Sequence, residues 1–355
     1  MARAFLRCAQ DRLCQWTITA KMAVPHQSEP LLGSGNPTPL PESHAQYLHS
    51  LTFGAKLTHY AQGQRRLLAD PKLETKTVGV IGAGTMGHGI AQILVRSGYT
   101  VLLNDVSQQF LDSGAARIAK GLNRGVEKNR LTGEEREQAL RRLTTTTRVS
   151  DLEAADFIIE AVTENLEAKV GVFRAVEPHC GPGVIFASNT SSISITRLAT
   201  ATQRPDRFVG LHFFNPVPVM KLVEVVPGLA TSLPTVETAE RLATTAGKTP
   251  VRVNDAPGFV SNRLLVPMIN EAVYCLMEGV ADAKGVDDVM KLGMNHPMGP
   301  LELADLIGLD VCLDIMKVLY ESFRDSKYRP CPLLEKMVNA GRLGRKTGQG
   351  FYEYR

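Results

Sequence analysis

His212 and Glu224 are the residues of this chain best suited to exchange a proton. His212 follows the apolar run 208–211, and Glu224 lies among valines in the run 221–226, with two prolines between them that turn the chain. A carboxylate in apolar surroundings needs a polar partner, and the returning hairpin offers the imidazole. The acid would orient the ring and stabilise the imidazolium formed when the ring takes a proton. The alternative is a His–Glu pair of the core without a catalytic role.

Other polar groups follow predicted strands or begin a predicted helix. Glu164 and the polar run 188–192 each come just after a short apolar run that reads as a buried strand. Ligands of open α/β sheets bind outside the carboxyl ends of the strands, although a Ser/Thr/Asn run is also typical of a turn or a helix cap. Asn262 lies in the first turn of a helix predicted over 259–277, where a polar group can face an anionic or carbonyl oxygen.

A glycine-rich turn indicates a dinucleotide site. It joins the β-branched run 77–81 to a helical pattern, and a second strand, 101–104, ends at Asp105. The glycines allow a tight turn, close approach of a pyrophosphate and close helix–strand packing, and the phosphates meet free N–H groups at the helix N-terminus. A carboxylate at Asp105 accepts hydrogen bonds from a ribose 2′-OH and repels a 2′-phosphate, which favours NAD over NADP. The predicted cofactor contacts are Gly82, Ala83, Gly84, Thr85, Met86, Gly87 and Asp105.

Four basic residues share one face of the next predicted helix. They are spaced by three, four and four positions, as neighbours on a helix surface are. Such a pattern is typical of a solvated basic face, and the sharper interpretation is a surface that meets an anionic ligand. The residues are Arg117, Lys120, Arg124 and Lys128. Beyond them, Thr132 and Glu135 have the spacing of a capping box that starts another helix.

Composition excludes several classes of protein. The 355 residues are 44% hydrophobic and 21% charged, values of an ordinary globular chain of two or three domains. No apolar segment is long enough to predict a membrane span. A net charge of +4, mostly from residues 1–24, argues against a nucleic-acid partner. The six cysteines form no C-x-x-C pair and no zinc spacing, so no metal site is predicted, and they indicate a reducing compartment.

The first 75 residues differ from the rest. Residues 1–24 are rich in Arg and Ala with one acid, which favours a mitochondrial transit peptide and the mitochondrial matrix. A disordered tail, or translation from Met22 and a cytoplasmic protein, are the alternatives. Residues 25–75 form a proline-rich linker or extension, predicted to be largely disordered, in which the apolar residues of 44–69 have the pattern of a short amphipathic helix.

The order of the elements predicts an α/β fold in two parts. A Rossmann-type, doubly wound sheet that binds NAD is expected over 76–256. An all-helical C-terminal domain is expected over 257–355, and its apolar faces need a partner within the chain or across a dimer. Its predicted helices run over about 259–277, 283–293, 300–324 and 332–341.

Over residues 76–355 the sequence resembles the 3-hydroxyacyl-CoA dehydrogenase family, of the single-function mitochondrial kind. The HFFNPVPVMKLVE stretch is the most specific, because relatives such as gulonate dehydrogenases share the Rossmann start but generally differ there. The carrying stretches are VGVIGAGTMGHGIAQ (78–92), EAVTENLEAK (160–169), FASNTSS (186–192), GLHFFNPVPVMKLVEVV (210–226), GFVSNRLL (258–265), HPMGPLELAD (296–305) and GRKTGQGFY (344–352).

The resemblance implies an activity and a set of site residues. The substrate would be a (3S)-3-hydroxyacyl-CoA, oxidised with NAD to the 3-ketoacyl-CoA in fatty-acid β-oxidation, and the helical domain would form a homodimer. His212 would act as general base with Glu224 as its partner, and Ser191 and Asn262 would hold the substrate oxygen or the cofactor. A family serine that contacts CoA is Gly121 here, which is a departure. The residues that match NAD-lining positions are Glu164, Lys169, Ser191, Asn215 and Lys346, and Lys128 matches a CoA-contacting lysine.

Two other functions compete with this one. A related hydroxyacid or sugar-acid dehydrogenase would act without CoA, and the basic face 117–128 and the HFFNPVP stretch argue against it. A binding or structural protein could keep the fold and lose turnover, but the intact His212, Glu224, Ser191 and Asn262 count against that. Fold alone does not decide between these functions.

Overall fold

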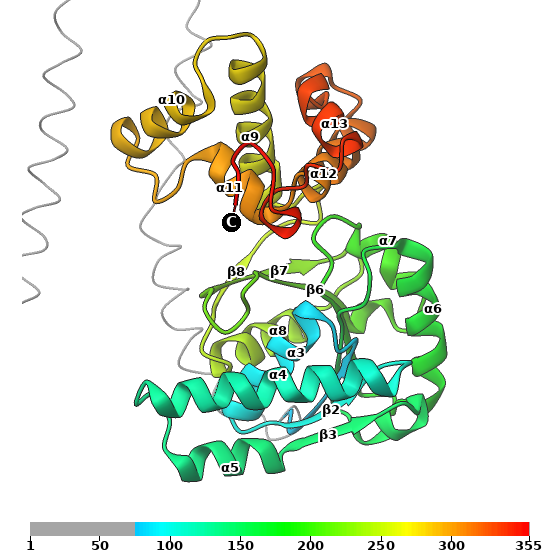
Figure 1. Cartoon of the computed structure of the whole chain (residues 1–355). Helices are drawn as coiled ribbons and strands as arrows, with labels where there is room; N and C mark the ends of the chain where they lie inside the picture. The colour runs from blue at the N-terminus through cyan, green and yellow to red at the C-terminus, as the bar shows by residue number, and fades with distance from the viewer. Residues whose placement is uncertain (1–74, 355) are drawn as a thin grey trace, which may run out of the picture. The chain divides into compact units, whose positions relative to one another are not determined.

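The computed structural model describes residues 75–354 (Figure 1). The predicted transit peptide 1–24, and the extension up to residue 74, lie outside the described residues. The described chain begins one residue before Lys76, where the Rossmann-type domain is predicted to start.

Eight strands form one sheet in the order β3-β2-β1-β4-β5-β6-β7-β8. All neighbouring strands are parallel except β6 and β7, which form the predicted hairpin. The strand order reverses direction at β1, as in a doubly wound sheet, so the predicted fold class is confirmed. The strands are β1 (Thr77–Ile81), β2 (Thr100–Asn104), β3 (Leu143–Thr146), β4 (Phe157–Glu160), β5 (Ile185–Ser188), β6 (Phe208–Phe213), β7 (Leu222–Pro227) and β8 (Thr249–Arg252).

Helices cover both faces of this sheet, and each face has its own apolar core. On one face α3, α4 and α8 contribute buried residues such as Ile90, Ile118 and Leu242. On the other, α6 and α7 contribute residues such as Phe173 and Leu198. The capping box predicted at Thr132 is confirmed at the start of α5. These helices are α3 (Thr85–Arg96), α4 (Gln108–Glu127), α5 (Gly133–Arg141), α6 (Leu166–Val176), α7 (Ile195–Ala199) and α8 (Leu233–Thr245).

The C-terminal part is helical, as predicted, and packs around a third core. One expectation is wrong: residues 300–324 form two helices, because Gly308 between them has φ of 108°, a left-handed conformation that ends a helix. The first helix begins at Ser261 rather than 259, since Phe259 has φ of 49°. The helices are α9 (Ser261–Met277), α10 (Ala283–Asp288, continued as a π-helix over Val289–Gly293), α11 (Pro300–Ile307), α12 (Leu309–Phe323) and α13 (Pro332–Asn339).

Candidate active site

The β6–β7 hairpin pairs His212 with Glu224. The two residues are direct partners in the antiparallel register, and 2.8 Å separates His212 Nδ1 from Glu224 Oε2. Both are buried, with 7% and 2% of their surface exposed. The sequence prediction that these residues meet across the hairpin is confirmed.

Glu224 is also held by the N-terminus of α9. Its Oε1 accepts hydrogen bonds from the backbone N–H groups of Ser261 at 3.0 Å and Val260 at 3.3 Å, and its Oε2 accepts one from the Ser261 hydroxyl at 2.9 Å. Burial works to raise the pKa of Glu224, but these donors and His212 outweigh it and hold the pKa below its ordinary value of 4.5. Sequence reasoning missed Ser261, although it lies beside Asn262 at the start of the helix.

Within residues 75–354, the His212 ring makes its hydrogen bond through Nδ1, and Nε2 makes none. Glu224 bonds to Nδ1 of the ring. The centroid of the His212 ring lies 4.5 Å from that of Phe214 and 5.9 Å from that of Phe259. A carboxylate on Nδ1 selects the tautomer with the proton on that nitrogen. Nε2 is then the atom of the ring that can take a proton from a ligand.

The segment after β5 is organised by Glu164. Glu164 Oε1 accepts hydrogen bonds from the Thr190 hydroxyl at 2.6 Å and the Ser191 N–H at 2.8 Å. The amide of Asn262 donates to the Ser191 backbone carbonyl at 3.0 Å, which links this segment to α9. The structure therefore joins Glu164 and Ser191, which the sequence analysis placed at the carboxyl ends of two strands, to Asn262 at the start of a helix.

Lys169 is wholly buried between two carboxylates. Its Nζ lies 2.7 Å from Glu160 Oε1 and 3.3 Å from Glu164 Oε2. Burial works to raise the pKa of Glu164, but the Lys169 charge and the Thr190 hydroxyl, with other donors, hold it below its ordinary value. Sequence reasoning predicted Lys169 and Glu164 but missed Glu160. Its place as a charged residue at the end of a buried strand was the available signal.

The glycine turn fits a dinucleotide. Gly82 has φ of 102°, and a Cβ on Gly87 would lie 1.7 Å from the Gly82 carbonyl oxygen, so both positions exclude side chains. A Cβ on Gly84 would project into open space at the N-terminus of α3, which has no side-chain cap. A pyrophosphate fits such a terminus. At the end of β2, Asp105 Oδ2 accepts a hydrogen bond from the Ala83 N–H at 2.7 Å, so the acid and the turn are adjacent.

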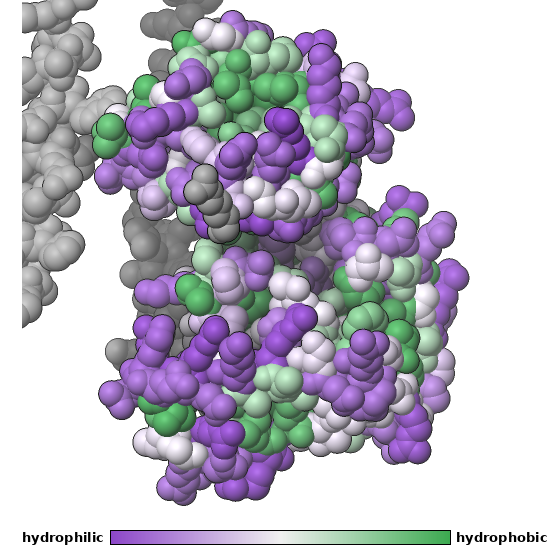
Figure 2. All heavy atoms as spheres, viewed as in Figure 1, coloured by the Kyte–Doolittle hydropathy of each residue, from purple (hydrophilic) through white to green (hydrophobic). Residues whose placement is uncertain are grey.

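Among residues 75–354, no hydrogen bond joins the predicted site residues Lys346, Asn215 and Lys128 to the His212–Glu224 pair or to the contacts of Ser191. Lys346 lies in the helical domain, where its Nζ is 2.5 Å from Asp310. Asn215 is exposed in the turn after β6, and Lys128 is exposed at the end of α4. The other members of the basic face are also exposed, and Figure 2 shows mostly hydrophilic surface over α4 and α5. Exposure agrees with both interpretations of that face.

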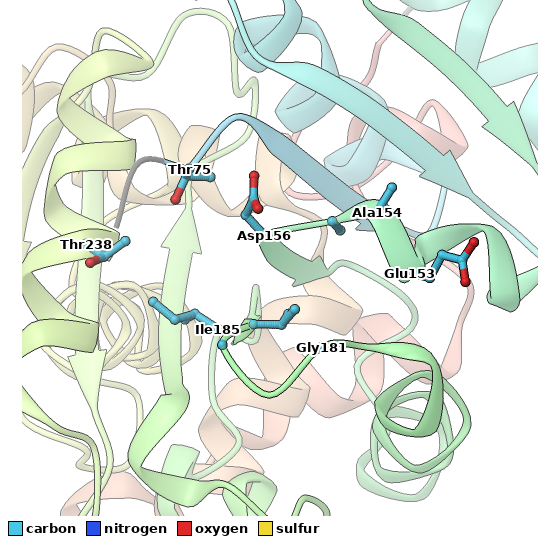
Figure 3. Close-up of a pocket in the computed structure, with 10 residues that line it drawn as sticks. Thr75, Glu153, Ala154, Asp156, Gly181, Ile185 and Thr238 are labelled. Atoms are coloured by element: carbon cyan, nitrogen blue, oxygen red, sulfur yellow. The ribbon is translucent and has the colours of Figure 1, made fainter. Parts of the chain in front are cut away.

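A cavity of about 320 Å³ lies at the amino ends of the strands, opposite the end that carries the candidate site (Figure 3). Its lining includes Thr75, Asp156 and Ile185, at the amino ends of the strands. Asp156 accepts hydrogen bonds from the backbone N–H groups of Lys76 and Thr77, a structural arrangement. Within the described part of the chain, no three His, Cys, Asp or Glu side chains could hold a metal ion, and no helix is long and apolar enough to cross a membrane.

Comparison with known proteins connects this geometry to a family. Residues 77–256 match the family model of the 3-hydroxyacyl-CoA dehydrogenase NAD-binding domain, and residues 258–354 match that of its C-terminal domain. A probable 3-hydroxybutyryl-CoA dehydrogenase of Bacillus subtilis is 54% identical over 79% of this chain and 98% of its own. The mitochondrial hydroxyacyl-coenzyme A dehydrogenase of Sus scrofa is 43% identical over 80% and 93% of the respective chains.

Solved structures agree with these sequence matches. A crystal structure of (S)-3-hydroxybutyryl-CoA dehydrogenase from Ralstonia eutropha is 51% identical, with a TM-score of 0.78 over 79% of this chain and all of the other. Matches to both family models together span nearly all of the described residues. The chain belongs to the 3-hydroxyacyl-CoA dehydrogenase family and carries its NAD-binding domain.

Proposed function

We propose that this protein oxidises (3S)-3-hydroxyacyl-CoA to 3-oxoacyl-CoA with NAD, as a step of fatty-acid β-oxidation. The observation that carries the proposal is the buried His212–Glu224 pair, in which Glu224 engages Nδ1 and leaves Nε2 of the ring available to a ligand. Family membership supports the substrate class, since the relatives in Bacillus subtilis and Ralstonia eutropha are named for 3-hydroxybutyryl-CoA.

In the proposed reaction His212 is the general base. Its Nε2 removes the proton of the C3 hydroxyl, and Glu224 stabilises the imidazolium ion that results. A bound NAD, held by the glycine turn and Asp105, would supply the acceptor for the hydride that leaves C3, so that the alcohol carbon becomes a carbonyl carbon. In the reverse direction the imidazolium returns its proton to the oxygen. Because Glu224 is anchored by α9 as well as by His212, the ring keeps its orientation through both directions.

The other site residues position the ligands in this proposal. Ser191 and Asn262 hold the substrate oxygen or the cofactor, and Lys128 contacts CoA at the end of the basic face. The departure at Gly121 leaves room for Gln92, whose amide oxygen lies 2.3 Å from where a Cβ at 121 would stand. The residues proposed to line the NAD site are Gly82, Ala83, Gly84, Thr85, Met86, Gly87, Asp105, Glu164, Lys169, Ser191, Asn215 and Lys346.

The deciding experiment follows NADH oxidation with acetoacetyl-CoA. Turnover with the CoA ester and NADH, and little with free acetoacetate or with NADPH, is the expected result. A folded protein that binds NADH but does not turn over the ester would contradict the proposed substrate. Turnover of free acetoacetate at a similar rate would favour a hydroxyacid dehydrogenase that acts without CoA.

Asp105→Ala tests the cofactor assignment. Loss of the carboxylate removes the acceptor for the ribose 2′-OH and the repulsion of a 2′-phosphate. We expect the preference for NADH over NADPH, measured as the ratio of kcat/KM values, to fall by about tenfold or more. An unchanged ratio would show that Asp105 serves only to brace the turn through its bond to Ala83.

We also propose that the helical domain forms a homodimer. Several large apolar side chains of this domain are exposed, and Figure 2 shows apolar surface over it. Exposed apolar patches of this kind mark protein interfaces. Sedimentation of the full chain at the mass of two copies is the expected result, and a monomer at micromolar concentration would contradict it. The residues are Leu264, Met277, Val280, Val289, Leu292 and Met294.

We propose that the protein is imported into the mitochondrial matrix. The basic, acid-poor composition of residues 1–24 supports it, as does the similarity to a mitochondrial protein of Sus scrofa. Fractionation of cells that express the full chain, beside a chain that starts at Met22, tests it. Equal matrix localisation of both would contradict a role for residues 1–24.

A further inference from the structure

Glu160 is a buried acid that the proposed reaction does not use. It is the last residue of β4, has 0% of its surface exposed, and pairs in register with Ile81 of β1 and Ser188 of β5. It therefore lies on a central strand of the sheet, at the carboxyl end of that strand, where the candidate site is also found. A charged group in such a place is costly unless its partners compensate.

Three donors satisfy Glu160. Its Oε1 accepts hydrogen bonds from the Lys169 ammonium and the Val162 backbone N–H, both at 2.7 Å. Its Oε2 accepts one from the Ser188 hydroxyl at 2.6 Å. The Glu160 side chain is thus fixed by a neighbouring strand, by the segment after its own strand and by α6, and it in turn fixes an ammonium that is itself fully buried.

Lys169 connects Glu160 to the candidate active site. Its ammonium also lies 3.3 Å from Glu164, which is the acceptor for the backbone and hydroxyl groups of Ser191. Ser191 in turn accepts from Asn262 on α9. A continuous series of polar contacts therefore runs from the centre of the sheet, through one buried cation, to the proposed catalytic residues.

We infer that Glu160 is a positioning residue, which acts through Lys169 and Glu164 to place Ser191. The inference rests on the proposed function, in which Ser191 and Glu164 contact substrate and cofactor. Glu160 and Glu164 share one ammonium, so each limits how far the cation can move toward the other. With Glu160 neutral, the ammonium is attracted to Glu164 alone. Glu164 Oε2 then moves toward the interior, and its Oε1 loses the geometry that holds the segment after β5.

A double-mutant cycle tests the inference. The cycle compares the wild-type protein with Glu160→Gln, Lys169→Met and the double variant. The NADH dissociation constant of each is measured by fluorescence titration, and its kcat and KM are measured with acetoacetyl-CoA. We expect Glu160→Gln to weaken NADH binding or lower kcat by about tenfold. In the Lys169→Met background the same change should add less than about twofold, because its route to the site is gone. Equal effects in both backgrounds would overturn the inference.

Asp287→Asn is the matched control. Asp287 is 1% exposed and also accepts three hydrogen bonds, but in the helical domain. It should lower thermal stability and leave the NADH dissociation constant and kcat within about twofold. If Glu160→Gln behaves in the same way, Glu160 is only structural and the inference fails.

Two further measurements test Glu160 if Glu160→Gln does not fold or if the protein does not turn over the ester. If Glu160→Gln does not fold, Ser188→Ala removes the donor to Oε2 and keeps the charge. We expect it to shift NADH binding or kcat in the same direction by about twofold to threefold, and unchanged values would overturn the inference. If the unchanged chain binds NADH without turning over the ester, the proposed substrate fails, while the NADH titrations still test Glu160.

Discussion

Two buried carboxylates, Glu224 in strand β7 of the sheet and Asp287 in the helical domain, have closely similar surroundings. Glu224 accepts backbone N–H groups from Val260 and Ser261, where α9 begins, and Asp287 accepts them from Leu301 and Glu302 in the first turn of α11. Each is almost fully buried. The N-terminus of a helix stabilises a carboxylate in both places. Burial and anchoring therefore do not distinguish a catalytic acid from a structural one.

The remaining partner makes the difference. Glu224 meets the His212 ring, whereas Asp287 accepts from the Tyr352 hydroxyl at 2.7 Å. Burial and the neighbouring acid raise the pKa of Tyr352 well above its ordinary value of 10.0, so the phenol keeps its proton. A histidine can accept a proton near neutral pH and an undissociated phenol cannot. The chemistry of the site thus depends on which group a buried acid orients.

The sharpest way to break this comparison is His212→Gln. The amide can still bond to Glu224 but cannot act as a base, so we expect kcat with acetoacetyl-CoA to fall about 10²–10⁴-fold. NADH affinity, measured by fluorescence, should stay within about twofold. Reduced NADH affinity with unchanged turnover would place His212 in cofactor binding instead.

Glu224→Gln should have the next largest effect. The neutral amide no longer stabilises the imidazolium, and it can present its NH₂ group toward Nδ1 and select the other tautomer. We expect kcat to fall about 10²-fold, because the ring remains but is less well oriented and charged. Steady-state kinetics beside circular dichroism separates this from unfolding. A kcat equal to that of the unchanged chain would make the pair a structural feature of the core.

Asp287→Asn tests the other side of the comparison. An amide offers one acceptor oxygen where the carboxylate satisfies three donors, and a buried unpaired donor costs about 1–3 kcal/mol. For a chain of this size that corresponds to a melting temperature lower by about 2–10 °C. We expect kcat at a temperature well below the transition to change by less than about twofold. A large loss of kcat without loss of stability would give Asp287 a role in the reaction.

Sequence reasoning succeeded where one local pattern determines the geometry. The hairpin prolines and the alternating valines set the register that brings His212 to Glu224, and the glycine turn determines where a phosphate can approach. It failed where the partner comes from elsewhere in the chain. Ser261 donates to Glu224, which lies 37 residues away in the sequence, and Ser188 donates to Glu160, which lies 28 residues away. A local spacing in the sequence cannot predict either contact.

The prediction for the helical domain failed at one glycine whose backbone conformation the apolar pattern does not indicate. Apolar periodicity predicted its helices, but Gly308 divides one of them because its φ of 108° redirects the chain between α11 and α12. Lys346 shows the reverse case. Resemblance places it at the NAD site, whereas the described structure pairs it with Asp310 of α12, 36 residues away, a contact that no local spacing predicts.

The smallest expected effect concerns acid pH, and it separates Glu224 from its amide variant. The pKa of Glu224 is lower in the folded protein than its ordinary value of 4.5. An unfolded chain therefore binds this proton more readily, so stability rises with pH between the two values and falls as pH drops through the folded pKa. Melting temperatures measured between about pH 3 and pH 5 should fall less steeply for Glu224→Gln than for the unchanged chain. Parallel curves would mean that His212 and Ser261 gain nothing from the charge on Glu224, and that its role is to accept hydrogen bonds, as Asp287 does.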